Sequence, residues 1–368
     1  MKVLFIATVT EHIKAFHLPY LRWFKEQGWE VHVAAYGDDE IPYCDRKHNI
    51  SVQRSPFRLS NIKAYFQLKA VLKNEKYDII HGHTPMGGVL TRLCGKKHRK
   101  NGTRVIYSAH GFHFYKGAPV LNWLLYYPME RWLSKHTDTL ITTNHEDYEL
   151  AKRKMKAKNI YYVPGVGVDT GRFASAAVDR ESKRSELGIP ADATVLISVG
   201  ELNKNKNHEV MIKAVAALNK PGVHYCIVGK GGFEPYLKKL SAAPGINVRL
   251  LGYRTDIADL LHMADIFVFP SLREGLSVSL MEAMAAGLPC VVSGIRGNVD
   301  LIEHSKGGFT CGTADIGGYV DAVKKIMKNP ELKKNMGEYN KTAVQGFSLA
   351  VVMEKLKEIY GICGENGI

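Results

Sequence analysis

Short apolar runs alternate with amphipathic stretches along most of this 368-residue chain. The runs in the first half include VLFIATV (3–9), EVHVAAY (30–36) and RVIYSAH (104–110), and those in the second half include ATVLISVG (193–200), VHYCIVG (223–229) and IFVFP (266–270). Strands that alternate with helices form parallel sheets with right-handed crossovers. We therefore expect an α/β protein made of two tandem, doubly wound Rossmann-like domains with a cleft between them.

The alternation is interrupted by PGVGVD at residues 164–169. The chain is also longer than a single hydrophobic core usually supports. We predict an N-terminal domain over residues 1–167 and a C-terminal domain over residues 168–346. An amphipathic stretch from Leu349 to Tyr360 follows a long helical tail. We expect a helix over residues 347–362 to complete the first domain.

The formal net charge of +14 is concentrated in the first half of the chain. Residues 1–170 hold 26 Lys and Arg against 15 Asp and Glu, whereas residues 171–368 hold 24 against 21. A basic surface of this kind attracts phosphates, which belong to an anionic lipid or to nucleic acid unless the charges are merely solvated. In the same half, WLLYYPMERWL (123–133) is typical of an interfacial helix or of a core helix.

Cysteine spacing and hydropathy indicate the compartment. The six cysteines form no C-x-x-C pair, which favours buried free thiols in a reducing compartment. The first apolar run is too short for a secretory signal, and no run reaches the roughly 18 to 20 apolar residues of a membrane span. We expect a cytoplasmic protein that is soluble or attached peripherally to the inner face of the membrane.

The most specific pattern lies in residues 265–293, where Glu274 follows an apolar run and Glu282 lies eight residues later in a helical stretch. This spacing predicts two carboxylates facing one crevice, where they can accept hydrogen bonds from sugar hydroxyls. The backbone N–H groups of the helix start suit a phosphate; they belong to Gly275, Leu276, Ser277, Val278 and Ser279. The pattern predicts a nucleotide-sugar site, with solvated helix charges as the alternative.

Two further loops at strand ends are candidates for parts of the nucleotide-sugar site. GELNKNKN (200–207) places Lys204 and Lys206 near the crevice, where a lysine can stabilise a diphosphate leaving group. Gly229 opens the turn GKGG after the next strand, and a glycine lets the backbone approach a ligand closely. The alternative for GELNKNKN is a solvated turn, and the alternative for GKGG is a plain turn.

Histidines also follow strands of the first half. His110 in SAHGFH ends a strand and is expected in the cleft from the opposite wall, unless it is structural. His81 and His83 are spaced like a metal pair, but we expect their side chains on opposite faces of the strand. Because no acidic residue clusters with them, we predict no metal site.

Several segments together resemble a known family. PSLREGLSVSLMEAMAAGLPCVVS (270–293) is similar to the E-x(7)-E signature of the retaining glycosyltransferases of family 4, which have the GT-B fold. VPGVGVDTGRF, DIIHGHTP and SAHGF resemble that family's interdomain segment, acceptor-domain strand and histidine loop. The opening through FHLPYLRWFKEQGWEVHVAA is similar to bacterial enzymes that build capsule, exopolysaccharide or lipid-linked oligosaccharide.

The resemblance implies roles for individual residues. It implies that Glu282 binds the ribose hydroxyls, that Glu274 contacts the donor sugar, and that the backbone around Leu276 to Ser279 holds the diphosphate. It further implies that Lys206 stabilises the departing phosphate, that His110 contacts the donor sugar, and that Arg254 packs against the base. We also expect His12 and His17 to line the acceptor pocket.

The chain departs from the family pattern at two places. Glu201 stands where the family usually has Arg, which removes a positive charge from the expected diphosphate clamp, and Lys204 or Arg273 can substitute for it. The first strand is followed by Thr8-Val9-Thr10-Glu11-His12 instead of a Gly-Gly turn. Phosphate contacts from that loop are therefore not expected to follow the family.

The predicted function is transfer of a hexose or N-acetylhexosamine from a UDP-sugar, with retained configuration, to a polyprenyl-diphosphate-linked saccharide. No metal and no cofactor are expected. The expected partners are the donor, the lipid-linked acceptor and an anionic membrane surface, without nucleic acid. The alternatives are a UDP-sugar 2-epimerase of the same fold and a basic nucleic-acid-binding protein.

Overall fold

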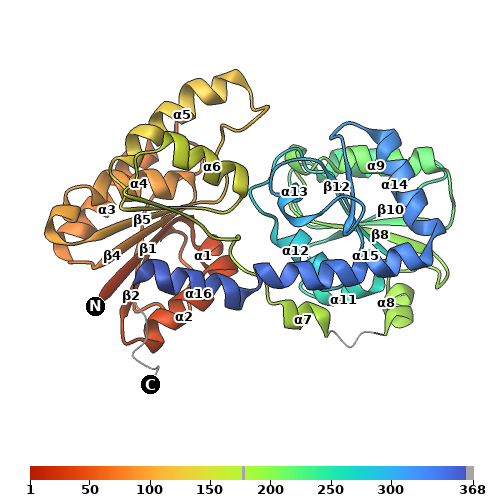
Figure 1. Cartoon of the computed structure of the whole chain (residues 1–368), viewed down its shortest axis with the longest axis horizontal. Helices are drawn as coiled ribbons and strands as arrows, with labels where there is room; N and C mark the ends of the chain where they lie inside the picture. The colour runs from red at the N-terminus through yellow and green to blue at the C-terminus, as the bar shows by residue number, and fades with distance from the viewer. Residues whose placement is uncertain (176–178, 362–368) are drawn as a thin grey trace. The chain divides into compact units, whose positions relative to one another are not determined.

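The computed structural model describes residues 1–175 and 179–361. Cys363 and position 362 of the predicted C-terminal helix lie outside these residues. The chain divides into two compact units, Met1–Val166 (unit 1) and Gly167–Ile368 (unit 2). Each unit contains one parallel sheet with helices on both faces (Figure 1). The predicted α/β class with two doubly wound sheets is confirmed.

The sheet of unit 1 has seven strands in the order β3-β2-β1-β4-β5-β6-β7. The strands are β1 (Lys2–Val9), β2 (Glu30–Tyr36), β3 (Arg46–Asn49), β4 (Ile79–His83), β5 (Arg104–Ala109), β6 (Thr139–Thr142) and β7 (Asn159–Tyr162). The strand order reverses between β1 and β4, which are hydrogen-bonded neighbours. The central strands β1 and β4 are buried along almost their whole length because both of their faces are covered, and β1 is mainly apolar.

Helices cover both faces of this sheet. The helices of one face are α1 (Thr10–Phe16) and α2 (Leu18–Glu26), and those of the other are α3 (Ser60–Asn74), α4 (Pro85–Gly95), α5 (Val120–Ser134) and α6 (His145–Lys154) (Figure 1). Arg92 of α4 is fully buried, and its guanidinium makes two hydrogen bonds, of 2.6 and 2.9 Å, to the carboxylate of Glu130 in α5. This pair joins α4 to α5.

The sheet of unit 2 has six strands in the order β10-β9-β8-β11-β12-β13. The strands are β8 (Thr194–Val199), β9 (Val223–Val228), β10 (Asn247–Gly252), β11 (Ile266–Phe269), β12 (Cys290–Ser293) and β13 (Gly308–Cys311). Here the order reverses between β8 and β11.

The helices of unit 2 also lie on both faces of its sheet. They are α7 (Thr170–Ala174), α8 (Arg180–Glu186), α9 (His208–Leu218), α10 (Glu234–Ser241), α11 (Ile257–Met263), α12 (Val278–Ala285), α13 (Asn298–Leu301), α14 (Ile316–Lys328) and α15 (Pro330–Ala343). The last described helix of the chain is α16 (Leu349–Tyr360). One apolar core includes side chains of α11 and α12, and a second includes side chains of α9 and α14. The two cores cover opposite faces of the sheet.

Unit 2 begins with a glycine that backbone geometry requires. Gly167 has a φ of +79°, and a Cβ atom there would lie 2.7 Å from the Cα of Leu349. The next residue, Val168, forms a parallel bridge with Ser348. The PGVGVD segment is therefore held at the start of unit 2 by the residues that precede α16.

Two elements differ from the sequence expectation. Residues Thr10–Phe16 form the helix α1, which we did not predict from the sequence. The edge strand β3 has the polar sequence RKHN and pairs with β2 on one side. In the part of the chain that the structure describes, no helix is both long and apolar enough to cross a membrane.

Candidate functional site

The crevice of unit 2 is defined by the loops that follow β8 and β11, at the position where the strand order reverses. Ligands bind at this position in open α/β sheets. The backbone N–H of Leu272 donates to the carbonyl of Asn205 over 2.8 Å, and the Asn205 side chain donates to the carbonyl of Arg273 over 2.9 Å. Asn207 extends the connection by donating to the carbonyl of Pro270 over 3.1 Å. The two loops therefore form one unit.

This connection brings together two predicted site residues. The Nζ of Lys206 lies 2.8 Å from Oε1 of Glu274, and the two side chains are only 16% and 13% exposed. The same ammonium lies 4.6 Å from the ring centroid of Phe269, at the end of β11. A positive charge is therefore held at the crevice by a carboxylate and by an aromatic face.

Glu282, the second of the two predicted carboxylates, lies inside α12, the helix that follows β11. It is a partly buried residue of α12, and its burial raises the pKa of the carboxyl to about 7. Arg172 of α7 acts in the opposite direction and lowers that pKa. Near neutral pH the carboxyl can therefore donate or accept a hydrogen bond.

The start of α12 contains the segment predicted to hold phosphate. Ser277 is the N-cap, and its hydroxyl accepts a hydrogen bond from the backbone N–H of Leu280 over 3.4 Å. The hydroxyls of Ser277 and Ser279 are 3.1 Å apart. The helix thus begins at Val278, and Gly275 and Leu276 precede its N-cap residue Ser277.

Gly229 has a structural reason to be glycine. Its φ is +145°, and a Cβ atom there would lie 1.9 Å from the carbonyl oxygen of Gly200. At Gly231, a Cβ atom would lie 2.3 Å from the carbonyl oxygen of Leu202. These two glycines therefore allow the turn after β9 to pack closely against the loop that carries Lys206.

The remaining predicted residues of unit 2 differ in their surroundings. The guanidinium of Arg254 donates to Asp256 over 2.6 and 2.8 Å and to Glu186 over 3.0 Å, and these carboxylates raise its pKa. Lys204 and Glu201 are exposed. The guanidinium of Arg254 is thus already held by acids of its own unit.

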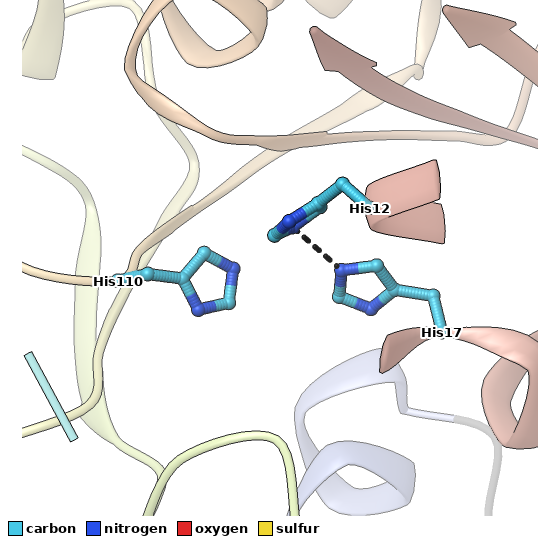
Figure 2. Close-up of side chains that lie close together, drawn as sticks. All are labelled: His12, His17 and His110. Carbon is cyan, nitrogen blue, oxygen red and sulfur yellow. Dashed lines mark hydrogen bonds between the residues drawn. The ribbon is translucent and has the colours of Figure 1, made fainter. Parts of the chain in front are cut away.

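Unit 1 contains a cluster of histidines at its own strand reversal. His12 lies in α1, which follows β1; His17 connects α1 to α2; and His110 follows β5. The Nε2 atoms of His12 and His17 are 3.2 Å apart, and the ring of His110 points toward the same space (Figure 2). His83, at the end of β4, has its ring centroid 3.9 Å from that of His17. We call these four residues the histidine cluster.

His81 belongs next to this cluster, and here the sequence expectation was wrong. The ring centroids of His81 and His83 are only 4.1 Å apart. Residues two apart in a strand share a face, because successive side chains alternate between faces. The two rings therefore lie side by side instead of on opposite sides of β4.

Burial is the main cause of the electrostatic state of these histidines. It lowers the pKa of His12 and of His81 to about 3 and the pKa of His110 to about 4. The pKa values of His17 and His83 are also far below the ordinary value, because both rings are buried and lie near other histidines. The imidazoles are therefore neutral at physiological pH.

A cavity of about 130 Å³ also lies in unit 1. Its lining is mainly apolar and aromatic and includes Met86, Tyr107, Phe112, Phe114, Tyr126 and Met129. Arg54 and Glu130 contribute charged groups to the wall. Such a lining suits an apolar ligand with a polar end.

Sequence reasoning missed several residues that build these sites. In unit 2 they are Arg172, Asn205, Asn207 and Phe269. In unit 1, His83 was considered only as a metal pair with His81, and its position beside His17 was not predicted. The repeated asparagines of NKNKN were a signal, because asparagine in a strand-end loop commonly bonds to neighbouring backbone. The roles of Arg172 and Phe269 depend on contacts between elements and have no local signal.

Two family models match the chain. The model described as Glycosyl transferases group 1 matches residues 179–343, and the model described as Glycosyl transferase 4-like matches residues 2–144. The first match covers the loops with Lys206, Glu274 and Glu282, and the second covers the histidine cluster.

Characterised and assigned relatives are also similar over most of their length. The Bacillus subtilis (strain 168) protein EpsD, assigned as a glycosyltransferase, is 41% identical over 98% of this chain and 96% of its own. The Escherichia coli UDP-Gal:alpha-D-GlcNAc-diphosphoundecaprenol alpha-1,3-galactosyltransferase is 31% identical over 82% of this chain and 80% of its own.

Solved structures share the fold at low sequence identity. HepE of Anabaena, crystallised with UDP-glucose, has a TM-score of 0.80 at 17% identity and covers 99% of this chain and 100% of its own. WaaG, a glycosyltransferase involved in lipopolysaccharide biosynthesis, has a TM-score of 0.72 at 17% identity and covers 98% of this chain and 99% of its own. The two-sheet architecture is therefore that of these enzymes.

Proposed function

Because this chain belongs to the group 1 glycosyltransferases of family 4, which have the GT-B fold, we propose that it transfers a hexose or N-acetylhexosamine from a UDP-sugar to a polyprenyl-diphosphate-linked saccharide. The enzyme class, a nucleotide-sugar-dependent glycosyltransferase, follows from the family. The choice of UDP and of a lipid diphosphate is supported by the E. coli relative, whose name contains both.

The observation that carries the donor site is the pairing of Lys206 with Glu274 next to the start of α12. A diphosphate at that helix start would meet backbone N–H groups and the helix dipole. It would also compete with Glu274 for the ammonium of Lys206. We propose that the bound donor takes Lys206 onto its phosphate and leaves Glu274 to accept hydrogen bonds from the sugar.

This exchange assigns a role to each group. Lys206 would neutralise charge on the departing UDP, and such a charge-stabilising contact contributes most when it is already oriented in a water-poor site. Glu282 would bind the ribose hydroxyls, because a carboxyl near its pKa can pair with a hydroxyl in either protonation state. Leu276 to Ser279 would contact the diphosphate through their backbone.

In unit 1 we propose that His12 and His17 belong to the acceptor site and that His110 contacts the donor sugar. Neutral imidazoles can both donate and accept hydrogen bonds, which suits sugar hydroxyls. The aromatic cavity near Met86 and Tyr126 would take the apolar end of a lipid-linked acceptor, with Arg54 toward its diphosphate.

A lipid-linked acceptor requires contact with a membrane surface, and the exposed side chains of α5 in unit 1 support such a contact. Its side chains Val120, Leu121 and Leu124 are 73%, 62% and 67% exposed. Near α3, Phe57 and Leu59 are 83% and 80% exposed. Exposed apolar side chains in a unit of high positive charge are typical of a protein that binds an anionic lipid surface.

The experiment that tests the proposal combines binding with turnover. Full-length protein is heated with UDP, GDP or ADP, and we expect UDP alone to raise the unfolding midpoint. Radiolabelled UDP-sugars are then incubated with undecaprenyl-diphosphate-linked N-acetylglucosamine, and the lipid fraction is counted. Stabilisation by another nucleotide, or label that never enters the lipid fraction with any UDP-hexose or UDP-N-acetylhexosamine, would contradict the proposal. A reaction with donor alone separates transfer from epimerisation, because only an epimerase changes the free donor.

A further inference from the structure

The histidine cluster has a geometry that sugar binding does not require. Three rings that come from separate positions, His12, His17 and His110, each offer a nitrogen atom, and these three atoms lie within 4.8 Å of one another. Figure 2 shows the rings of His12 and His110 directed into the space beside His17. A neutral imidazole carries a proton on one ring nitrogen and a lone pair on the other, so each ring can offer one nitrogen as a ligand.

The spacing of the first pair matches metal ligation. Tetrahedral zinc with Zn–N bonds of about 2.0 to 2.1 Å holds its ligand atoms roughly 3.3 to 3.4 Å apart. The Nε2 atoms of His12 and His17 are 3.2 Å apart. In the metal-free protein this pair shares one proton, and binding of a cation would require that proton to move to the other nitrogen of its ring. The nitrogen of His110 would need to approach by at most about 1.4 Å to reach the same spacing.

The hydrogen bonds within the cluster do not satisfy all of its ring nitrogens. His17 is only 1% exposed, and its Nδ1 atom is buried without a hydrogen-bond partner among the described residues. Nε2 of His83 is in the same state. A buried polar nitrogen without a partner costs free energy, so the hydrogen bonds of the cluster leave part of its bonding capacity unused.

Neighbouring groups hold the rings in place. Nδ1 of His83 lies 3.4 Å from Nε2 of His110, and Nε2 of His81 lies 2.8 Å from the hydroxyl of Ser108. The ring of Phe5 stacks on His83 at a centroid distance of 5.7 Å. Metal sites typically have such outer contacts, which fix the orientation of the ligand rings.

We propose that His12, His17 and His110 form a binding site for Zn²⁺ or a similar late first-row divalent cation in unit 1. Imidazole ligands favour these ions over Mg²⁺ and Ca²⁺, which prefer oxygen. Three protein ligands leave a fourth tetrahedral position, which water or an oxygen of a bound anion can occupy. The site uses the same three histidines as the proposed acceptor and donor-sugar contacts, but its test does not require sugar transfer. It changes the prediction of no metal that we made from the sequence.

Direct metal binding tests the proposal without any activity measurement. Full-length protein, freed of any affinity tag, is titrated with ZnCl₂ in competition with a chromophoric chelator, and with CoCl₂ while the visible absorption is recorded. We expect one ion per chain and the d–d bands of a four-coordinate cobalt site with nitrogen ligands. Saturation with Zn²⁺ should raise the unfolding midpoint of the wild-type protein.

Matched variants locate the site. His12→Ala and His110→Ala change partly buried side chains, and we expect each to weaken zinc binding at least tenfold. His98→Ala changes a histidine of the 3₁₀ helix η1 (His98–Asn101) in the same unit, and its binding should equal that of the wild type. Circular dichroism checks that each variant is folded, and His12→Gln replaces His12→Ala if the latter is not.

Three results would overturn the proposal. The first is wild-type protein that fails to bind Zn²⁺ at micromolar concentration. The second is folded His12 and His110 variants that bind as tightly as His98→Ala. The third is a thiolate charge-transfer band in the cobalt spectrum, which would place the ion on a cysteine such as the partly exposed Cys44.

Discussion

The ammonium of Lys206 lies 2.8 Å from the carboxylate of Glu274, and the loops that carry them are joined through Asn205 and Asn207. The sequence assigned these side chains to two different parts of the donor, the leaving phosphate and the sugar. Their pairing means that a donor phosphate would compete with Glu274 for the ammonium of Lys206. Binding of the diphosphate and release of Glu274 are therefore expected to be coupled.

The first prediction concerns this coupling. Lys206→Ala should reduce the transfer rate more than it reduces UDP affinity, because its charge is needed most as the phosphate departs. Glu274→Gln should lower transfer more than tenfold. Initial rates and UDP titrations of both variants, with Glu338→Gln on the exposed side of α15 as the control, measure the difference. Equal losses of rate and affinity in Lys206→Ala would contradict a leaving-group role.

The second prediction concerns pH and Glu282. Burial raises its pKa in the folded state from the ordinary value of 4.5 to about 7. A raised folded pKa contributes stability that is fully present below pH 4.5 and is lost as the pH rises through 7. The loss is on the order of 3 kcal/mol, since the pKa rises from 4.5 to about 7 and one pKa unit is about 1.4 kcal/mol.

Glu282→Gln keeps the shape of the protonated side chain and cannot ionise. We therefore expect the variant to be more stable than the wild type at about pH 8 and similar to it at about pH 4.5. Unfolding midpoints across this range measure the difference. If the gap between the two proteins does not widen as the pH rises, the carboxyl of Glu282 is not held in a desolvated position.

The third prediction concerns loop packing at Gly229. Gly229→Ala would place a Cβ atom 1.9 Å from the carbonyl oxygen of Gly200, at a φ of +145°. We expect a loss of at least about 2 kcal/mol in stability and a large loss of transfer, since the displaced loop carries Lys206. Gly232→Ala is the matched control, because nothing lies within 4 Å of the added atom. A Gly229→Ala variant as stable as this control would show that the loops do not pack as described.

The fourth prediction concerns the membrane surface. Leu121→Glu combined with Leu124→Glu on α5 should reduce binding to vesicles of anionic phospholipid more than tenfold, because burial of each leucine contributes about 1.5 to 3 kcal/mol. Co-sedimentation measures the bound fraction. Val299→Glu in α13, at a position 50% exposed in unit 2, is the control for the added charge. Equal binding by all three proteins would exclude α5 from the lipid contact.

Much of the fold followed from the sequence because it has strong local signals. Apolar runs such as those of β1 and β9 predicted buried strands, and the amphipathic stretch Leu349–Tyr360 forms α16, inside the range 347–362 that we predicted as helix. Polar or short elements had no such signal. The edge strand β3 is formed because the neighbouring strand β2 offers it backbone partners, and its own residues RKHN do not favour a strand.

The candidate site divides in the same way. The sequence by itself determined which residues stand at strand ends, since Glu274, Lys206 and His110 each follow an apolar run, and it determined the family. Only the tertiary structure decided which of them meet: Lys206 pairs with Glu274, Gly229 packs on the loop of Lys206, and His12 and His17 converge with His110. The physical reason is that strand ends are set by local hydrophobic pattern, whereas contacts between their loops depend on sheet order and register, which are fixed by distant parts of the chain.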